Sequence, residues 1–178
     1  MGAGILPVCL IKGNVFFLMG QERSTKEWSD FGGRTNKNES IYQTAIREGS
    51  EELNGLLGVP KDIGKLIKHN LVKQVHHDIY TTFIINMPYI YNDAFLNTFD
   101  NVNRFAEKHL QECIKIPDNG LYEKVKIKWF SIDDLKSDLK RKKSRFRPFY
   151  KNILYLLLES ETDIKKNISL QLPLSLSL

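Results

Sequence analysis

The sequence predicts a single domain of the mixed α/β class, and three observations support this prediction. The chain has 178 residues, enough for one compact core but few for two domains. Residues 39–54 carry apolar side chains at the spacing of a helix, whereas residues 79–87 are rich in β-branched and aromatic side chains, as strands are. No internal repeat and no linker-like stretch divides the chain.

The N-terminal region is expected to begin with a hairpin. Apolar, β-prone runs at 4–11 and 15–19 flank residues 12–14, where glycine followed by asparagine suits a tight turn. The polar, glycine-containing stretch 24–38 is then predicted to be a loop that leads into the helix over 39–54.

Helices and strands continue to alternate after that helix, which is expected to stop at Asn54 and Gly55 because both tolerate left-handed backbone. Strands are predicted at 63–75, 79–87 and 122–130, and helices at 93–115, after Ser131 and at 148–160. The expected domain therefore spans residues 1–160. Residues 161–178 are expected to form a C-terminal tail, either an edge strand or a flexible end, because every second residue from Leu170 to Leu178 is leucine.

Composition and charge narrow the class of protein. The net charge of +5 and the pI of about 9.1 favour an anionic partner such as a nucleotide or RNA. The strongly apolar run 153–158 is too short to cross a membrane, and the N-terminus lacks the features of a secretory signal. Cys9 and Cys113 each lie in an apolar segment, so a reducing compartment, the cytoplasm, is expected.

Three glutamates on the helix over 39–54 predict a metal site. Glu48, Glu51 and Glu52 are spaced i, i+3 and i+4, so their carboxylates share one side of a helix and repel one another unless a cation joins them. Clusters of oxygen ligands are what Mg²⁺ and Mn²⁺ prefer. The spacing alone would equally suit a solvated acidic helix face. The glycine pair at 32–33 favours the metal site, because it lets the backbone bend tightly and approach the same ion.

The stretch 33–55 resembles the Nudix box, written G-x5-E-x7-R-E-U-x-E-E-x-G-U with U a bulky aliphatic residue. The positions that match in identity and spacing are Gly33, Glu39, Arg47, Glu48, Glu51 and Glu52. The upstream hairpin and the segment 128–135 also look like Nudix neighbours, although 28–33 lacks the proline that many members have before the glycine pair.

Three positions of the box depart from the pattern. Gly49 stands where the first U belongs, Asn54 replaces the glycine, and Gly55 replaces the last U. Gly49 falls near the centre of the helix's apolar face. We therefore expect that a bulky side chain from another element fills the space there, or that the helix lies unusually close to the sheet.

The resemblance implies an α/β/α sandwich around a mixed sheet and Mg²⁺- or Mn²⁺-dependent hydrolysis of a P–O–P linkage in a nucleoside-diphosphate-linked substrate. It implies that Glu48 and Glu52 are metal ligands and that Glu51 is a third ligand or holds a metal-bound water. It further implies that the Gly33 carbonyl completes the shell and that Arg47 orients Glu48 or Glu39.

The resemblance also implies a further carboxylate on a later loop, as ligand or general base. Glu123 is the candidate, and an exposed charge at a strand edge is its alternative.

Candidate substrate contacts lie outside the box. Arg23, after the second hairpin strand, is a candidate for a phosphate, and Trp28 either stacks on a base or covers the core. Residues 140–147 hold six cations in eight positions and form either a track for RNA phosphates or a solubilising helix end. The cations of this run proposed as contacts are Lys140, Lys142, Lys143 and Arg145.

Of the substrates that such an enzyme takes, capped mRNA fits the basic charge best. Decapping is found in Nudix proteins of large DNA viruses, and the lysine- and asparagine-rich composition is compatible with such a source, which would make the host cytoplasm the location. Small nucleotides, nucleotide sugars and diphosphoinositol polyphosphates stay open, as does a catalytically silent module that binds nucleotides or RNA. The sequence does not indicate an oligomeric state.

Overall fold

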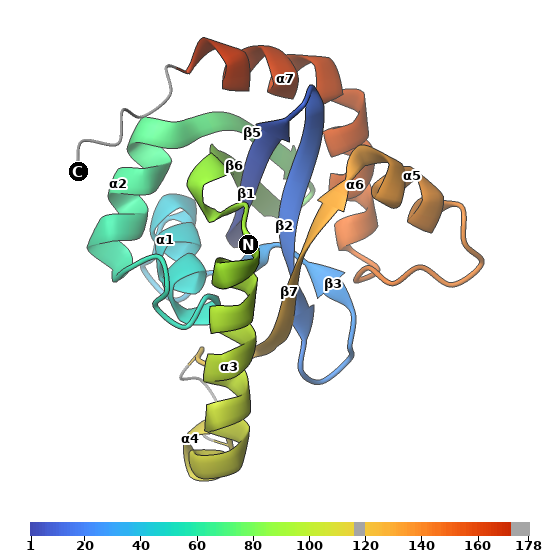
Figure 1. The fold of residues 1–178 in the computed structure, drawn as a ribbon. Helices are drawn as coiled ribbons and strands as arrows, with labels where there is room; N and C mark the ends of the chain where they lie inside the picture. The colour runs from blue at the N-terminus through green and yellow to red at the C-terminus, as the bar shows by residue number, and fades with distance from the viewer. Residues whose placement is uncertain (116–119, 172–178) are drawn as a thin grey trace.

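A seven-stranded mixed sheet forms the centre of the computed structural model, which describes residues 1–115 and 120–171. Helices cover both faces of this sheet, so the fold is the α/β/α sandwich that was expected (Figure 1). The strands are β1 (Gly2–Ile11), β2 (Asn14–Glu22), β3 (Trp28–Ser29), β4 (Phe31–Arg34), β5 (Leu71–His77), β6 (Tyr80–Asn86) and β7 (Lys124–Ser131).

The long strand β1 organises the sheet. It forms the predicted antiparallel hairpin with β2, and Val8 lies opposite Phe17. Its other edge pairs in parallel with β6, which in turn pairs antiparallel with β5. The first half of β1 also pairs with β4, while β7 and β3 pair with β2. The C-terminal end of β2, the start of β7 and the glycine-rich β4 are therefore neighbours.

One face of the sheet is covered by α1 (Ile41–Glu52), α2 (Pro60–Asn70) and α3 (Asp93–His109), which is followed by the short α4 (Gln111–Lys115). The other face is covered by α5 (Ile132–Leu139), α6 (Tyr150–Glu159) and α7 (Glu161–Leu170). Each layer has its own apolar core, because Ala45, Ile63 and Phe99 pack on the first face while Leu135 and Ile153 pack on the second. A short 3₁₀ turn, η1 (Pro88–Ile90), links β6 to α3.

Helix α1 begins and ends at local signals. Ser40 accepts a hydrogen bond from the backbone N–H of Gln43, whose side chain in turn accepts from the backbone of Ser40, and this reciprocal pair is a capping box. Beyond the end of the helix, Asn54 and Gly55 have positive φ angles of 51° and 70°. The predicted helix over 39–54 is thus confirmed, within two residues at each end.

The strand predicted over 63–75 is wrong in its first half, because residues 60–70 form helix α2. Pro60 lies in the first turn, where its missing N–H costs nothing, and Lys68 and His69 lie in the last turn, where cations favour the helix dipole. The buried Ile63 and Ile67 are four residues apart and lie on one face of the helix.

The predicted tail is also helical where the structure describes it. Residues 161–170 form α7, which buries Ile164 and Ile168 against the sheet beside β5. The Asn167 amide donates to the carbonyl of Val72 at 3.0 Å, which fixes the helix on that strand. The two isoleucines are spaced four apart, so they favour a helix over an edge strand. The alternating leucines from 172 onward lie outside the described residues.

The expectation for Gly49 is confirmed. A Cβ atom on Gly49 would lie 2.6 Å from Cδ1 of Ile5, so the isoleucine of β1 fills the space of the missing side chain. The glycine lets α1 approach the sheet closely, directly beside its carboxylates.

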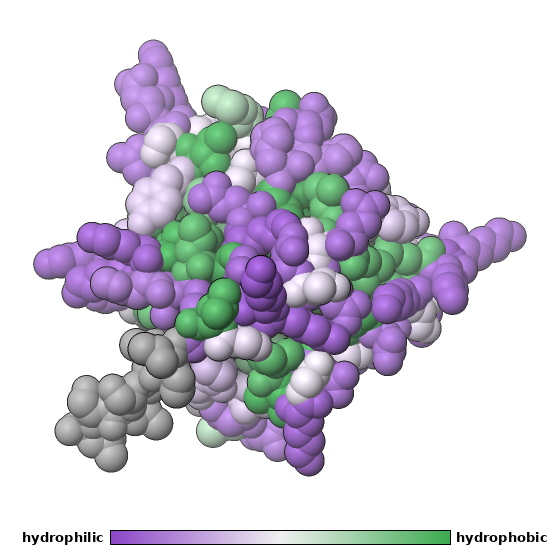
Figure 2. Space-filling model, turned by 90° about the horizontal axis from the view of Figure 1, so that it is seen from above, coloured by the Kyte–Doolittle hydropathy of each residue, from purple (hydrophilic) through white to green (hydrophobic). Residues whose placement is uncertain are grey.

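Among the residues that the structure describes, no helix has the length and apolar character needed to span a membrane. Figure 2 shows the face seen from above, where hydrophobic groups form separate patches between hydrophilic ones.

Candidate active site

Helix α1, the end of β2 and the residue before β7 bring carboxylates together beside β4. Glu48 and Glu52 lie one turn apart on α1 and face β4, and Glu52 is only 2% exposed. Glu22 ends β2, and Glu123 precedes β7, the strand that pairs with β2. Oxygen atoms of Glu22, Glu52 and Glu123 lie within 4.8 Å of one another. The candidate Glu123 therefore joins the helix carboxylates.

The glycine pair of β4 brings its backbone against α1. The N–H of Gly32 donates to Oε2 of Glu52 at 2.6 Å. A Cβ atom on Gly33 would lie 2.4 Å from Oε1 of Glu48, so a side chain there would displace the carboxylate. The carbonyl oxygen of Gly33 lies on the side of Gly2, and its part as a metal ligand stays a prediction.

Arg47 contacts three carboxylates. Its Nε and Nη2 donate to the two oxygens of Glu39 at 3.0 and 3.1 Å. Its Nη1 lies 2.8 Å from Oε1 of Glu48 and 2.9 Å from Oε2 of Glu51. This guanidinium lowers the pKa of Glu39 to about 2, because it stabilises the ionised carboxylate. Arg47 therefore holds both Glu39 and Glu48 in position.

The electrostatics of the site favour a bound cation. Burial raises the pKa of Glu48, Glu52 and Glu123 above the ordinary value for glutamate, and neighbouring carboxylates raise each of them further. A cation that joins these groups would relieve both effects. The donors are all carboxylate oxygens, which is the set that suits Mg²⁺ or Mn²⁺.

Two side chains of this site, Glu22 and Lys124, were not singled out from the sequence. The ammonium of Lys124 lies 2.5 Å from Oε1 of Glu22 and 3.3 Å from Oε1 of Glu52. A register shift between Gln21 and Glu22 sets Glu22 opposite Lys124 on β7. Such a bulge depends on pairing between strands that are distant in sequence, so no local sequence pattern predicts it.

Trp28 covers the core, which is the second of the two alternatives for it. It is 6% exposed and packs edge-on against Phe130, with the ring centroids 5.1 Å apart. Its backbone bonds to that of Arg145 and Arg147 on both sides. Trp28 is a core residue that anchors the end of the basic run.

Arg23 is held by protein acceptors, and its contact with a phosphate stays a prediction. Its guanidinium lies 2.6 Å from Glu107 and donates to the carbonyl of Tyr122 at 2.8 Å. It therefore ties the end of β2 to α3.

The basic run 140–147 divides into two parts. Lys140, Lys142 and Lys143 are exposed and have no acidic partner among the described residues. Arg145, in contrast, binds the fully buried Asp138 through its side chain, and its backbone N–H donates to the same carboxylate at 2.9 Å. Asp138 therefore already holds Arg145, and the contact of Arg145 with a substrate stays a prediction.

Arg147 was also missed, although it reaches the acidic site. Its Nη1 donates to Oε1 of Glu22 at 3.0 Å, and its guanidinium lies 4.9 Å from the ring centroid of Phe149. Arg147 and Phe149 line a pocket of about 320 Å³ with Gly33, Arg34 and Tyr80. The pocket opens beside the box glycines.

A buried carboxylate supports the floor of this pocket. Asp30 accepts hydrogen bonds from the hydroxyls of Tyr80 at 2.8 Å and Thr82 at 2.7 Å. Burial raises the pKa of Asp30 to about 6, and the two hydroxyls offset part of that effect. Asp30 therefore fixes the tyrosine ring that lines the pocket.

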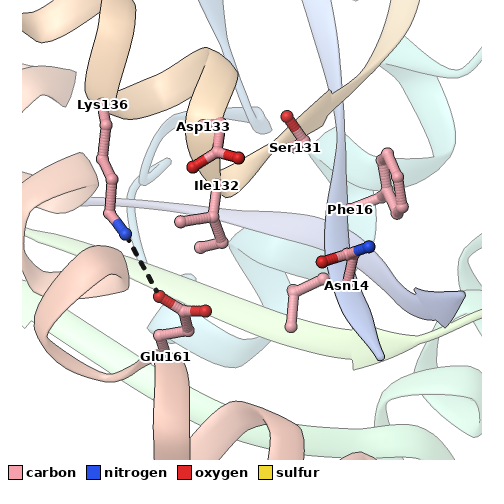
Figure 3. A pocket seen from close by; sticks show the side chains of 8 residues that line it. Asn14, Phe16, Ser131, Ile132, Asp133, Lys136 and Glu161 are labelled. Atoms are coloured by element: carbon pink, nitrogen blue, oxygen red, sulfur yellow. Dashed lines mark ion pairs between the residues drawn. The ribbon is translucent and has the colours of Figure 1, made fainter. Parts of the chain in front are cut away.

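A second pocket, of about 350 Å³, lies elsewhere. Figure 3 shows that Asn14, Phe16, Ser131 and the Lys136–Glu161 ion pair line it. Asn14 begins β2 and Glu22 ends it, so this pocket and the carboxylates lie at opposite ends of the strand, about 27 Å apart along it. The pocket takes no part in the acidic site.

Comparisons with known proteins agree with this geometry. The chain matches the family model described as NUDIX domain over residues 1–153. Its structure is similar to that of a C. elegans Ap4A hydrolase, at 14% identity, with 90% of this chain and 96% of that chain covered and a TM-score of 0.50. It is also similar to a bifunctional NMN adenylyltransferase/ADP ribose pyrophosphatase from Francisella tularensis, at 17% identity, with 89% and 41% covered and a TM-score of 0.51.

At these identities the solved structures show the shared fold, and no curated protein sequence matches the chain. The family model covers most of the chain, and every charged position of the box is present in it. The chain therefore belongs to the Nudix family.

Proposed function

We propose that this enzyme uses Mg²⁺ or Mn²⁺ to hydrolyse a P–O–P linkage and that its substrate is the cap of an mRNA. The observation that supports the chemistry is the cluster of buried carboxylates against the glycine pair, where Glu48 and Glu52 would hold the ion. A bound divalent ion offsets the charge of a diphosphate and lowers the pKa of an attacking water.

The chain's own residues have separate parts in this proposal. Arg47 keeps Glu48 and Glu51 in a fixed orientation, since one of its nitrogens contacts both. Glu123 is exposed at the edge of the cluster, and partial desolvation together with the nearby Glu22 raises its pKa above the ordinary value for glutamate. It is the candidate to accept the proton of the attacking water.

The proposal for capped RNA rests on where the basic run lies. Arg147, at one end of the run, contacts Glu22 of the acidic site, and Lys140, Lys142 and Lys143 at the other end are free to meet phosphates. A chain of phosphates can therefore extend from the carboxylates along this surface. A free nucleotide is the second candidate, favoured by the pocket beside Gly33 with the 41% exposed ring of Phe149 in its wall.

Turnover of a panel of substrates with Mg²⁺ and with Mn²⁺ tests the reaction and its substrate. The panel holds capped RNA, a dinucleoside polyphosphate, ADP-ribose, a nucleotide sugar and an inositol pyrophosphate. Capped RNA should be the best substrate. Faster hydrolysis of free nucleotides than of capped RNA would favour the second candidate, and no metal-dependent turnover of any of them would indicate a silent module.

A triple variant tests the RNA track separately. Changing Lys140, Lys142 and Lys143 to Ala should weaken capped-RNA binding and reduce its log-affinity salt slope by about 0.7 for each lost contact to a single strand. The matched control changes the three exposed lysines of α2, Lys61, Lys65 and Lys68. Equal salt slopes for the two variants would refute the track, while turnover of a free nucleotide should be the same in both.

A further inference from the structure

Lys124 is buried inside the acidic site. It is 0% exposed, and its ammonium donates to Oε1 of Glu22 at 2.5 Å and to the hydroxyl of Ser29 at 2.9 Å. Its third neighbour is Oε1 of Glu52 at 3.3 Å. The ammonium therefore makes two hydrogen bonds and one further ion pair, all to protein groups.

The fold provides a slot for this side chain. A Cβ atom on Gly20 would lie 2.8 Å from both Cγ and Cδ of Lys124, so the glycine of β2 makes room for the lysine stem. The register shift after Gln21 then sets Glu22 opposite Lys124. A charge buried this deeply is costly unless its partners are in place, and the slot supplies them.

A divalent ion at the position of the ammonium would contact the same two carboxylates. The ammonium lies between one oxygen of Glu22 and one oxygen of Glu52, two carboxylates that would otherwise repel each other at close range. The other oxygen of Glu52 accepts from the backbone of Gly32. In contrast, the side chain of Glu51 is 28% exposed, and Glu123 is exposed at the outer side of the cluster.

We propose that Lys124 is a positioning residue that acts as a built-in cation and takes the place of one divalent ion between Glu22 and Glu52. This inference rests on the proposed metal-dependent function of the same site. It follows that Glu22 and Glu52 keep their positions without metal, because the lysine holds them. Divalent ions then bind on the exposed side of the cluster, and Glu22 is not one of their ligands.

Counting bound Mn²⁺ tests the inference without relying on activity. The full chain is titrated with Mn²⁺ while electron paramagnetic resonance measures the free ion. Lys124→Met should bind one more Mn²⁺ per chain than the parent. Its melting temperature in EDTA should fall by roughly 10 °C, and Mn²⁺ should restore more of it than in the parent. The control Lys126→Met, exposed on the same strand, should leave both readouts unchanged.

A purely structural lysine would lower the melting temperature but leave the Mn²⁺ count equal to that of the parent, and this result would overturn the inference. If Lys124→Met does not fold, Glu22→Gln/Lys124→Met removes both charges and should keep the parent's count. A lower count in this double variant would show that Glu22 binds metal in the parent and would equally overturn the inference. Hydrolysis is scored separately, so a parent that binds Mn²⁺ but cleaves nothing refutes only the proposed function.

Discussion

Helix α1 rests on β1 at a contact that one added carbon atom should disturb. A Cβ on Gly49 would lie 2.6 Å from Cδ1 and 2.9 Å from Cγ1 of Ile5, both closer than real Cβ atoms approach other carbons. Alanine in place of a helical glycine usually gains about 1 kcal/mol, whereas overpacking a core costs about 1–3 kcal/mol. We therefore expect Gly49→Ala to lose about 1 kcal/mol net, and Gly49→Leu to lose roughly 1–3 kcal/mol.

A double-mutant cycle measures this clash directly. Ile5→Val removes the nearest atom, Cδ1, and alone should cost about 1 kcal/mol. Combined with Gly49→Ala, it should be more stable than the sum of the single changes by about 1 kcal/mol, as measured from urea midpoints at constant m-value. Gly64→Ala on α2 is the control, since its nearest neighbour, the tip of Ile46, lies 3.3 Å away. A stabilising Gly49→Ala, or strict additivity with Ile5→Val, would refute the packing argument.

Three further outcomes are expected. Glu52→Gln should keep the fold by circular dichroism and lower turnover by about 100-fold or more, because it removes an anion that holds the cation; near-parental turnover would refute that role. Glu39→Gln should lose about 1–2 kcal/mol at pH 7 by urea unfolding. The difference in unfolding free energy between the parent and the variant should disappear as the pH falls from about 4.5 to about 2, since Arg47 lowers the pKa of Glu39. A difference that persists at pH 2 would contradict this role of Arg47. Ile164→Ala should cost about 2–4 kcal/mol by thermal melting if α7 belongs to the domain, whereas a dispensable tail would show no loss.

Features with local causes could be predicted from the sequence. The ends of α1 are set by Ser40 and by Asn54 with Gly55, which act within a few residues of themselves. The i, i+4 spacing places Glu48 and Glu52 on one face whatever the rest of the chain does. Even the unusual Gly49 was informative, because a missing side chain on a buried face requires a neighbour. That the neighbour is Ile5 depends on how a helix and a distant strand align, which no local pattern reveals.

The burial of Lys124 shows why the rest of the site was missed. In β7, Lys124, Lys126 and Lys128 alternate with apolar residues, a pattern that predicts three solvent-facing lysines. The alternation holds for the last two, which are exposed. The register shift sets Lys124 opposite Glu22, whereas Lys126 lies opposite Gln21, so Lys124 is on the other face of the sheet, where Gly20 and Glu22 cover it. A period-2 pattern gives the side of the sheet only while the register is regular, and pairing with a distant strand decides where the register shifts.

The cations that were predicted to contact phosphate also depend on partners that are distant in sequence. Arg23 and Arg145 were expected to meet phosphates because of their charge, yet Glu107 and the buried Asp138 already hold them. An arginine can recognise a substrate only with the donors that its own protein leaves free, and acidic partners far away in sequence decide how many those are. Lys140, Lys142 and Lys143 retain theirs, as the absence of acidic partners among the described residues indicates. Within the basic run, Lys140, Lys142 and Lys143 are therefore the cations left to test as phosphate contacts, and Arg147 at the other end of the run contacts Glu22.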